Sequence, residues 1–102
     1  MTEKMALLIV DLQNDFCPGG ALQITNGDRV IGPTNQVVRS FREAGLPVLA
    51  SRDWHLPDTG HFREFGGLWP VHCVRETAGA AFHPLLNLPP EAVIFSKGTD
   101  LS

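Results

Sequence analysis

The stretch LPVLASRDWH, residues 46–55, joins an apolar run to a group of polar side chains. Residues 47–50 have the composition of a buried strand, and Asp53, Trp54 and His55 follow them almost at once. In an extended segment, residues i and i+2 point to the same side, so the Asp53 carboxylate and the His55 imidazole are expected to converge. The stretch therefore predicts a buried strand with a functional site at its carboxyl end.

Two other apolar runs are similar to this strand. They span residues 6–10 and 92–95, and all three runs are nearly continuous, as in a parallel sheet with both faces covered. A helical pattern between the first two runs has one largely apolar face, formed by Val30, Thr34, Val37, Val38 and Phe41. The order strand, helix, strand predicts an α/β fold, with a parallel sheet and flanking helices.

The expected helix has recognisable ends. Asp28 is a plausible N-cap and Gly45 a plausible C-terminal stop, whereas Pro33 marks either a kink or the true start. After the second strand, residues 54–90 are rich in Gly, Pro and His, with a short helix expected near residues 78–86. A segment this long without regular pattern is usually functional or disordered.

Bulk composition narrows the class of protein. The 102 residues suit a single domain spanning 1–102, and the net charge of −3 without a basic run argues against nucleic acid or an anionic membrane as partner. The apolar stretch at residues 5–10 is too short for a signal peptide or a membrane span. We therefore expect a cytoplasmic protein whose two cysteines are reduced.

Charged side chains follow the other two strands as well. Asp11 comes directly after the first strand and Lys97 after the third. Parallel strands present their carboxyl ends along one edge, where ligands bind in open α/β folds, so these residues and Asp53 are expected to lie close together. The Asp11–Lys97 pair is then either a proton acceptor beside a cation or a structural ion pair.

The four histidines of the chain all fall between residues 55 and 83. An aspartate with three histidines is a suitable shell for one divalent ion such as Zn²⁺, Mn²⁺ or Fe²⁺. The alternative is a set of surface histidines beside a turn or capping aspartate. The candidate ligands are Asp53, His55, His61 and His72, with His83 set aside as a packed or turn residue.

Aromatic residues in the same loops allow two interpretations. Phe16 and Trp69 would form a flat slot for a planar ring, or they pack in the core, as aromatic side chains usually do. The thiols of Cys17 and Cys73 also lie near the expected site. Neither is at a predicted helix N-terminus, where a thiol becomes acidic most readily, so a structural thiol is favoured over a nucleophile.

Together these segments resemble the nicotinamidase branch of the isochorismatase-like cysteine hydrolases. The matching segments are LLIVDLQNDFCPGGAL, SRDWHLPDTGHF, LWPVHCV, GAAFHP and VIFSKGTD, in that order from residue 7 to residue 100. The resemblance implies a Rossmann-like three-layer α/β/α fold, with an incomplete sheet here. It implies hydrolysis of nicotinamide to nicotinic acid and ammonia in NAD salvage.

The resemblance also implies roles for individual residues. One divalent metal ion would orient the pyridine ring. Asp11 and Lys97 would belong to a Cys-Asp-Lys triad, Phe16 and Trp69 would hold the ring, and the metal ligands would be Asp53, His55, His61 and His72, with Glu64 a second candidate in that loop.

The sequence departs from the family pattern at the nucleophile. The family's nucleophilic cysteine follows a later strand than the one at VIFSKG, and this sequence ends at Ser102. We therefore expect the N-terminal portion of such a domain, with an exposed apolar sheet edge. The chain would then form a homo-oligomer or pair with a chain that supplies the missing C-terminal part. Two alternatives stay open, a non-catalytic metal- or ligand-binding fragment and a hydrolase of another substrate.

Overall fold

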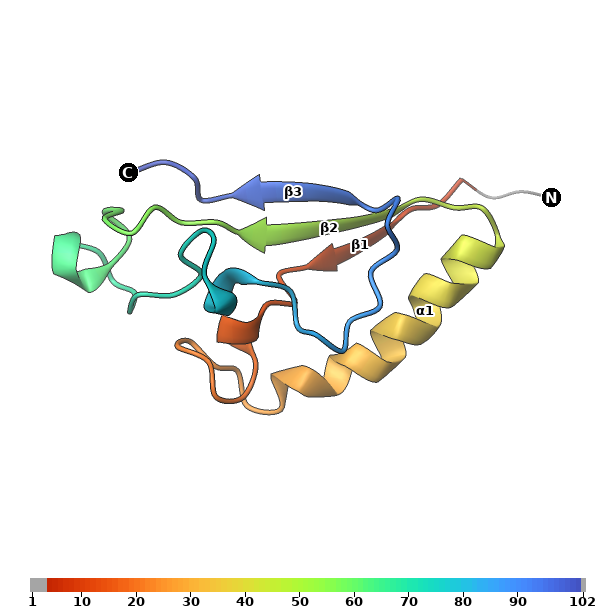
Figure 1. The fold of residues 1–102 in the computed structure, drawn as a ribbon, viewed down its shortest axis with the longest axis horizontal. Coiled ribbons are helices and arrows are strands. Elements are labelled where there is room, and N and C mark those ends of the chain that lie inside the picture. The colour runs from red at the N-terminus through yellow and green to blue at the C-terminus, as the bar shows by residue number, and fades with distance from the viewer. Residues whose placement is uncertain (1–3, 102) are drawn as a thin grey trace.

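Residues 4–101 are described by a computed structural model, and the predicted domain of residues 1–102 includes four terminal residues outside that range. Three parallel strands form one sheet in the order β1-β2-β3, and the one α-helix of the described residues lies beneath it (Figure 1). The elements are β1 Leu7–Val10, α1 Ile31–Glu43, β2 Val48–Asp53 and β3 Val93–Lys97. All three predicted strands are confirmed, and β2 and β3 continue beyond their apolar runs into the polar residues that follow.

The register of the sheet sets the position of those polar residues. The pairing of β1 with β2 runs from Leu7 opposite Val48 to Val10 opposite Ser51. The pairing of β2 with β3 ends with Asp53 opposite Lys97. The carboxyl ends of all three strands therefore lie at one edge, as expected, and the long segment after β2 gathers beside this edge (Figure 1).

The ends of α1 differ in part from the prediction. Asp28 is not its N-cap, because Asn26 takes a left-handed conformation and starts a 3-10 helix, Gly27–Val30, that leads directly into α1. Pro33 is the third residue of α1, where a missing N–H leaves no intrahelical bond unmade, so it marks the start and not a kink. Gly45 follows the helix at a φ of +71°, which confirms it as the stop.

The core lies between α1 and the sheet. Ile31 and Val38 of α1 are buried against Ile9, Val48 and Ala50 of the strands. The predicted apolar face of α1 is buried only in part, since Val30 and Val37 line an open apolar groove of about 540 Å³ between the helix and β1. This groove contains none of the candidate site residues.

The sheet is incomplete, as expected. In the described part of the chain β1 and β3 are both edge strands, and every residue of β3 is exposed. The apolar side chains Val93, Ile94 and Phe95 are 44–50% exposed. The chain therefore presents an apolar sheet edge of the kind that pairs with another strand.

The segment after β2 contains little regular structure. The helix expected near residues 78–86 is reduced to a 3-10 turn, Ala78–Ala80, because the chain becomes extended at Ala81 and Pro84 disfavours a helical conformation at the residue before it. Within residues 4–101, no helix is long and apolar enough to cross a membrane.

Candidate functional site

The three strand ends meet at one lysine. Lys97 Nζ lies 2.7 Å from Asp11 Oδ2 and 2.7 Å from Asp53 Oδ1. The expected contact between Asp11 and Lys97 is therefore present, together with a second carboxylate that the sequence had assigned only to the metal shell. One ammonium group holds two carboxylates side by side, although its own side chain is half exposed.

The charge of Lys97 is stabilised by these contacts. Burial by itself lowers the pKa of Lys97, but the hydrogen bonds to Asp11 and Asp53 and their negative charges outweigh it and hold the pKa above its ordinary value. The side chain therefore remains an ammonium ion throughout the neutral range, as a group that stabilises negative charge must.

Asp11 is held from two directions. Its backbone adopts a left-handed conformation, with a φ of +55°, which costs about 1–3 kcal/mol in a residue other than glycine. Its Oδ1 accepts a hydrogen bond of 2.8 Å from the Ser51 hydroxyl, while Oδ2 faces Lys97. Sequence reasoning missed Ser51, although a hydroxyl after four apolar residues was a signal that a polar partner lies nearby.

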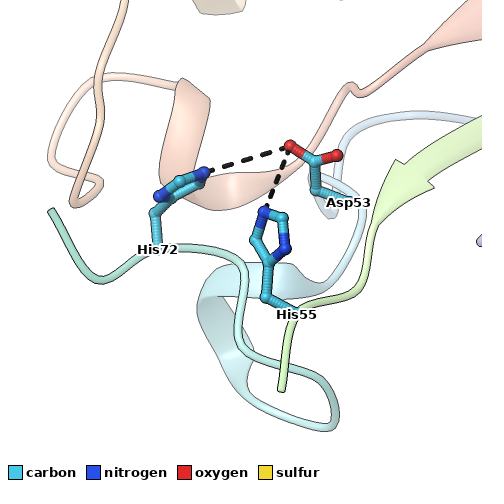
Figure 2. Close-up of side chains that lie close together, drawn as sticks. All are labelled: Asp53, His55 and His72. Atoms are coloured by element: carbon cyan, nitrogen blue, oxygen red, sulfur yellow. Dashed lines mark ion pairs between the residues drawn. The ribbon is translucent and has the colours of Figure 1, made fainter. Parts of the chain in front are cut away.

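Asp53, His55 and His72 form a compact group of possible metal ligands (Figure 2). Asp53 Oδ2 lies 3.7 Å from His55 Nε2 and 4.0 Å from His72 Nε2, and one ligand atom from each residue lies within 4.8 Å of the others. These separations exceed hydrogen-bond length. Around a tetrahedral zinc ion, donors stand about 3.3 Å apart, so a small inward movement would bring the three to ligand positions.

Both imidazoles are oriented by backbone carbonyls. His55 Nδ1 lies 2.9 Å from the Gly98 carbonyl oxygen, and His72 Nδ1 lies 2.7 Å from that of Pro70. A carbonyl only accepts hydrogen bonds, so a neutral ring carries its proton on Nδ1 and turns the lone pair of Nε2 toward Asp53. This arrangement is typical of metal-binding histidines, and the residues present therefore fit a divalent ion.

His61, the fourth expected ligand, lies farther away. Its ring centre is 5.7 Å from that of His55, and it lines the same cavity, but its nitrogens are not within the compact group. Glu64, the second candidate, is exposed on the 3-10 turn Arg63–Phe65 and does not line the cavity. His83 Nδ1 accepts a hydrogen bond from the Leu85 N–H, as suits a turn residue.

A cavity of about 430 Å³ opens beside these residues. Phe16 and Trp69, the two aromatic residues expected to hold a planar ring, both line it. Phe16 packs 5.7 Å from the His72 ring between centres, and Trp69 is 51% exposed at the opening. The remaining lining residues are Leu22, Asp53, His55, His61, His72, Lys97 and Gly98. A space of this size, lined by both apolar and charged side chains, suits a small polar aromatic molecule.

Gln13 holds the backbone of Asp53 and was missed by sequence reasoning. Its fully buried side chain donates hydrogen bonds of 2.8 Å to the carbonyls of Asp53 and Ala80. It also accepts one of 2.9 Å from the Asp53 N–H. An uncharged polar side chain three residues after the end of β1 was the available signal, but its partners lie 40 and 67 residues away along the chain.

Neither cysteine has the environment of a nucleophile. Cys17 and Cys73 are 3% and 0% exposed. Burial, followed by the nearby carboxylate of Asp15, raises the pKa of Cys73 to about 12, and burial and Asp28 raise the pKa of Cys17. Both side chains are therefore thiols at neutral pH, which favours their interpretation as structural residues.

Known proteins resemble both the sequence and the fold. Residues 5–100 match the Isochorismatase domain family. The chain is 40% identical to the nicotinamidase of Escherichia coli (strain K12) over 108 aligned residues, covering 91% of this chain and 51% of that protein. It is 38% identical to the nicotinamidase/pyrazinamidase of Mycobacterium tuberculosis, with the same two coverages. The chain thus spans about half the length of these curated relatives.

Solved structures agree with the fold. The pyrazinamidase of Pyrococcus horikoshii in complex with zinc superposes with a TM-score of 0.92 at 47% identity, over 98% of this chain and 55% of that one. The PnC1 protein of L. infantum in complex with nicotinate superposes with a TM-score of 0.86 at 34% identity, over 95% and 48%.

Proposed function

The chain belongs to the isochorismatase family, and from this premise we propose that it forms the acid–base, ring-binding and metal-binding part of a nicotinamide amidohydrolase. The reaction would convert nicotinamide to nicotinic acid and ammonia, a step of NAD salvage. The nicotinamidases among its relatives and the complexes with zinc and nicotinate in similar structures support this proposal.

One observation carries the proposal, the position of Asp53 between two groups. One of its oxygens contacts Lys97, and the other faces His55 and His72. Lys97, which is paired with Asp11, therefore lines the same cavity as the metal ligands. Nicotinamide has a ring nitrogen at one end and a carboxamide at the other, so it matches a cavity with both groups in its wall.

The residues take the following roles in this proposal. Asp11 accepts the proton of an attacking thiol, and Lys97 keeps Asp11 in place and offsets negative charge during attack. Phe16 and Trp69 pack against the pyridine ring. Asp53, His55, His72 and His61 would hold a zinc, manganese or iron ion, which would supply Lewis acidity toward the ring nitrogen.

The attacking thiol is neither Cys17 nor Cys73, since both are buried and protonated. Attack on the carboxamide carbon forms a C–S bond, and the C–N bond breaks as the departing nitrogen takes up a proton from Asp11. Water then cleaves the thioester, giving nicotinic acid and restoring the thiol. The buried thiols also favour a second candidate, a module that binds metal and nicotinamide without turnover.

Binding and turnover are tested separately. We expect the purified chain to bind about one zinc ion and, once loaded, to bind nicotinamide without releasing ammonia. The double variant Asp53→Ala/His55→Ala should lose the zinc. Catalysis is tested in a chimera in which residues 5–100 replace the matching half of the Escherichia coli nicotinamidase.

The chimera should release ammonia from nicotinamide, and its Asp11→Asn variant should be slower by about 10²–10⁴-fold. A folded, zinc-loaded chimera without activity would favour the module that only binds. Ammonia release by the chain alone, abolished by alkylation, would show that one of its own cysteines attacks.

A further inference from the structure

Gly98 lies closer to His55 than any other residue type would allow. Its carbonyl oxygen is 2.9 Å from His55 Nδ1, and its φ is +65°. A Cβ atom built on Gly98 would lie 2.6 Å from His55 Cε1 and 2.8 Å from Nδ1. Such distances are well inside the normal contact between carbon and ring atoms, so a side chain at this position requires something to move.

We infer that Gly98 is a positioning residue for the metal site, an inference that rests on the proposed function. Its carbonyl keeps the His55 proton on Nδ1, and its missing side chain leaves room for the ring. Together these two properties keep His55 Nε2 turned toward Asp53 Oδ2.

The backbone around Gly98 has little freedom to relieve a clash. The Lys97 carbonyl accepts a hydrogen bond of 2.9 Å from the Trp54 N–H, which fixes the chain just before Gly98. After it, the Leu101 carbonyl accepts a bond of 2.6 Å from the Gly60 N–H, and the Asp100 carbonyl accepts one of 3.2 Å from the Thr59 hydroxyl. The segment is therefore anchored on both sides.

The His55 ring is equally confined, except on the side of the cavity. It is 6% exposed and packs edge-on against the rings of Phe62 and His72, at 5.5 and 5.0 Å between centres. A Cβ at Gly98 would therefore push the ring toward the cavity and displace Nε2 from its place opposite Asp53. The expected result is a loss of metal affinity and not merely of stability.

Gly45 provides a matched control. Its φ of +71° is close to that of Gly98, but a Cβ built there meets no atom within 4 Å. Alanine is strained at both positions by the left-handed backbone, so both variants should lower the melting temperature to a similar degree. Only Gly98→Ala should also disturb His55.

The test is a zinc titration of wild-type, Gly98→Ala and Gly45→Ala proteins against a chromophoric chelator, with folding checked by circular dichroism. We expect Gly98→Ala to bind zinc about 10- to 100-fold more weakly and Gly45→Ala to bind like wild type. The ¹⁵N shifts of His55 in the zinc-free proteins give a second readout. The wild type should carry its ring proton on Nδ1, and Gly98→Ala should show a mixture of tautomers.

Two results would overturn the inference. One is a folded Gly98→Ala protein with wild-type zinc affinity. The other is a wild-type His55 protonated on Nε2, and this measurement requires no variant to fold. A wild-type protein that binds no zinc would refute the proposed metal site itself, while the tautomer of His55 would still show whether Gly98 orients the ring.

Discussion

Replacing Gln13 by methionine removes three hydrogen bonds from the base of the site. The Asp53 N–H, the Asp53 carbonyl and the Ala80 carbonyl lose their partners, which lie at 2.8–2.9 Å. An unpaired buried polar group costs about 1–3 kcal/mol. The two groups of Asp53 are only partly buried and take values near the lower end of this range, so the three lost hydrogen bonds together cost about 4 kcal/mol. Methionine has a similar length and an apolar chain, which offsets about 1 kcal/mol. The free energy of unfolding should therefore fall by about 3 kcal/mol.

Urea unfolding measures this loss. For a domain of this size a decrease of about 3 kcal/mol lowers the urea midpoint by about 2 M. Gln36 is exposed on α1, so Gln36→Met is a matched control and should leave the midpoint unchanged. If Gln13→Met shifted the midpoint no more than Gln36→Met does, the buried amide would not be holding Asp53 and the reasoning would be wrong.

The remaining predictions concern charge, thiols and the outer histidine. Because the pKa of Lys97 is raised in the folded protein, the stability that its ion pairs provide is fully present below its unfolded pKa and is lost as the pH rises through the folded value. The difference in unfolding free energy between wild type and Lys97→Met should therefore be constant in the neutral range and shrink as the pH rises above about 10, and a difference that stays constant in alkali would contradict the ion pair. Both cysteines should resist a thiol reagent at pH 8 until urea unfolds the chain, since Cys73 is 0% exposed with a pKa of about 12; rapid labelling of the native protein would refute this. His72→Ala should weaken zinc binding more than His61→Ala, because only His72 lies in the compact group, and the reverse order in a zinc titration would place His61 among the inner ligands.

The sequence predicted the strands because their apolar runs are continuous, and it placed Asp11, Asp53 and Lys97 together because parallel strands end at one edge. It did not predict how far β2 and β3 extend, since the pairing of Arg52 with Ser96 and of Asp53 with Lys97 depends on backbone hydrogen bonds and not on hydrophobicity. Asp28 was wrong as a cap because the chain is already helical there.

No local pattern identifies the partners of the residues that sequence reasoning missed, although Ser51 and Gln13 each carried a local signal. Gln13 and Gly98 contact groups 40 and 43 residues away along the chain, and in both contacts a main-chain group is one partner. Ser51 contacts a side chain, that of Asp11, which directly follows the neighbouring strand β1. Such partners become visible only when the register of the sheet is known.

The same register explains why the buried strand β2 determines which polar side chains meet in the site. Val48 and Ala50 are 5% and 0% exposed, so their burial against α1 determines which face of β2 points to the core. A slip of one residue between β2 and β3 would turn every side chain of the moving strand to the opposite face. Lys97 would then point away from Asp53 and Asp11, and the carbonyl of Gly98 would leave His55. The contacts of the charged pair and of the metal ligands thus depend on the burial of the apolar residues a few positions earlier, in LPVLA.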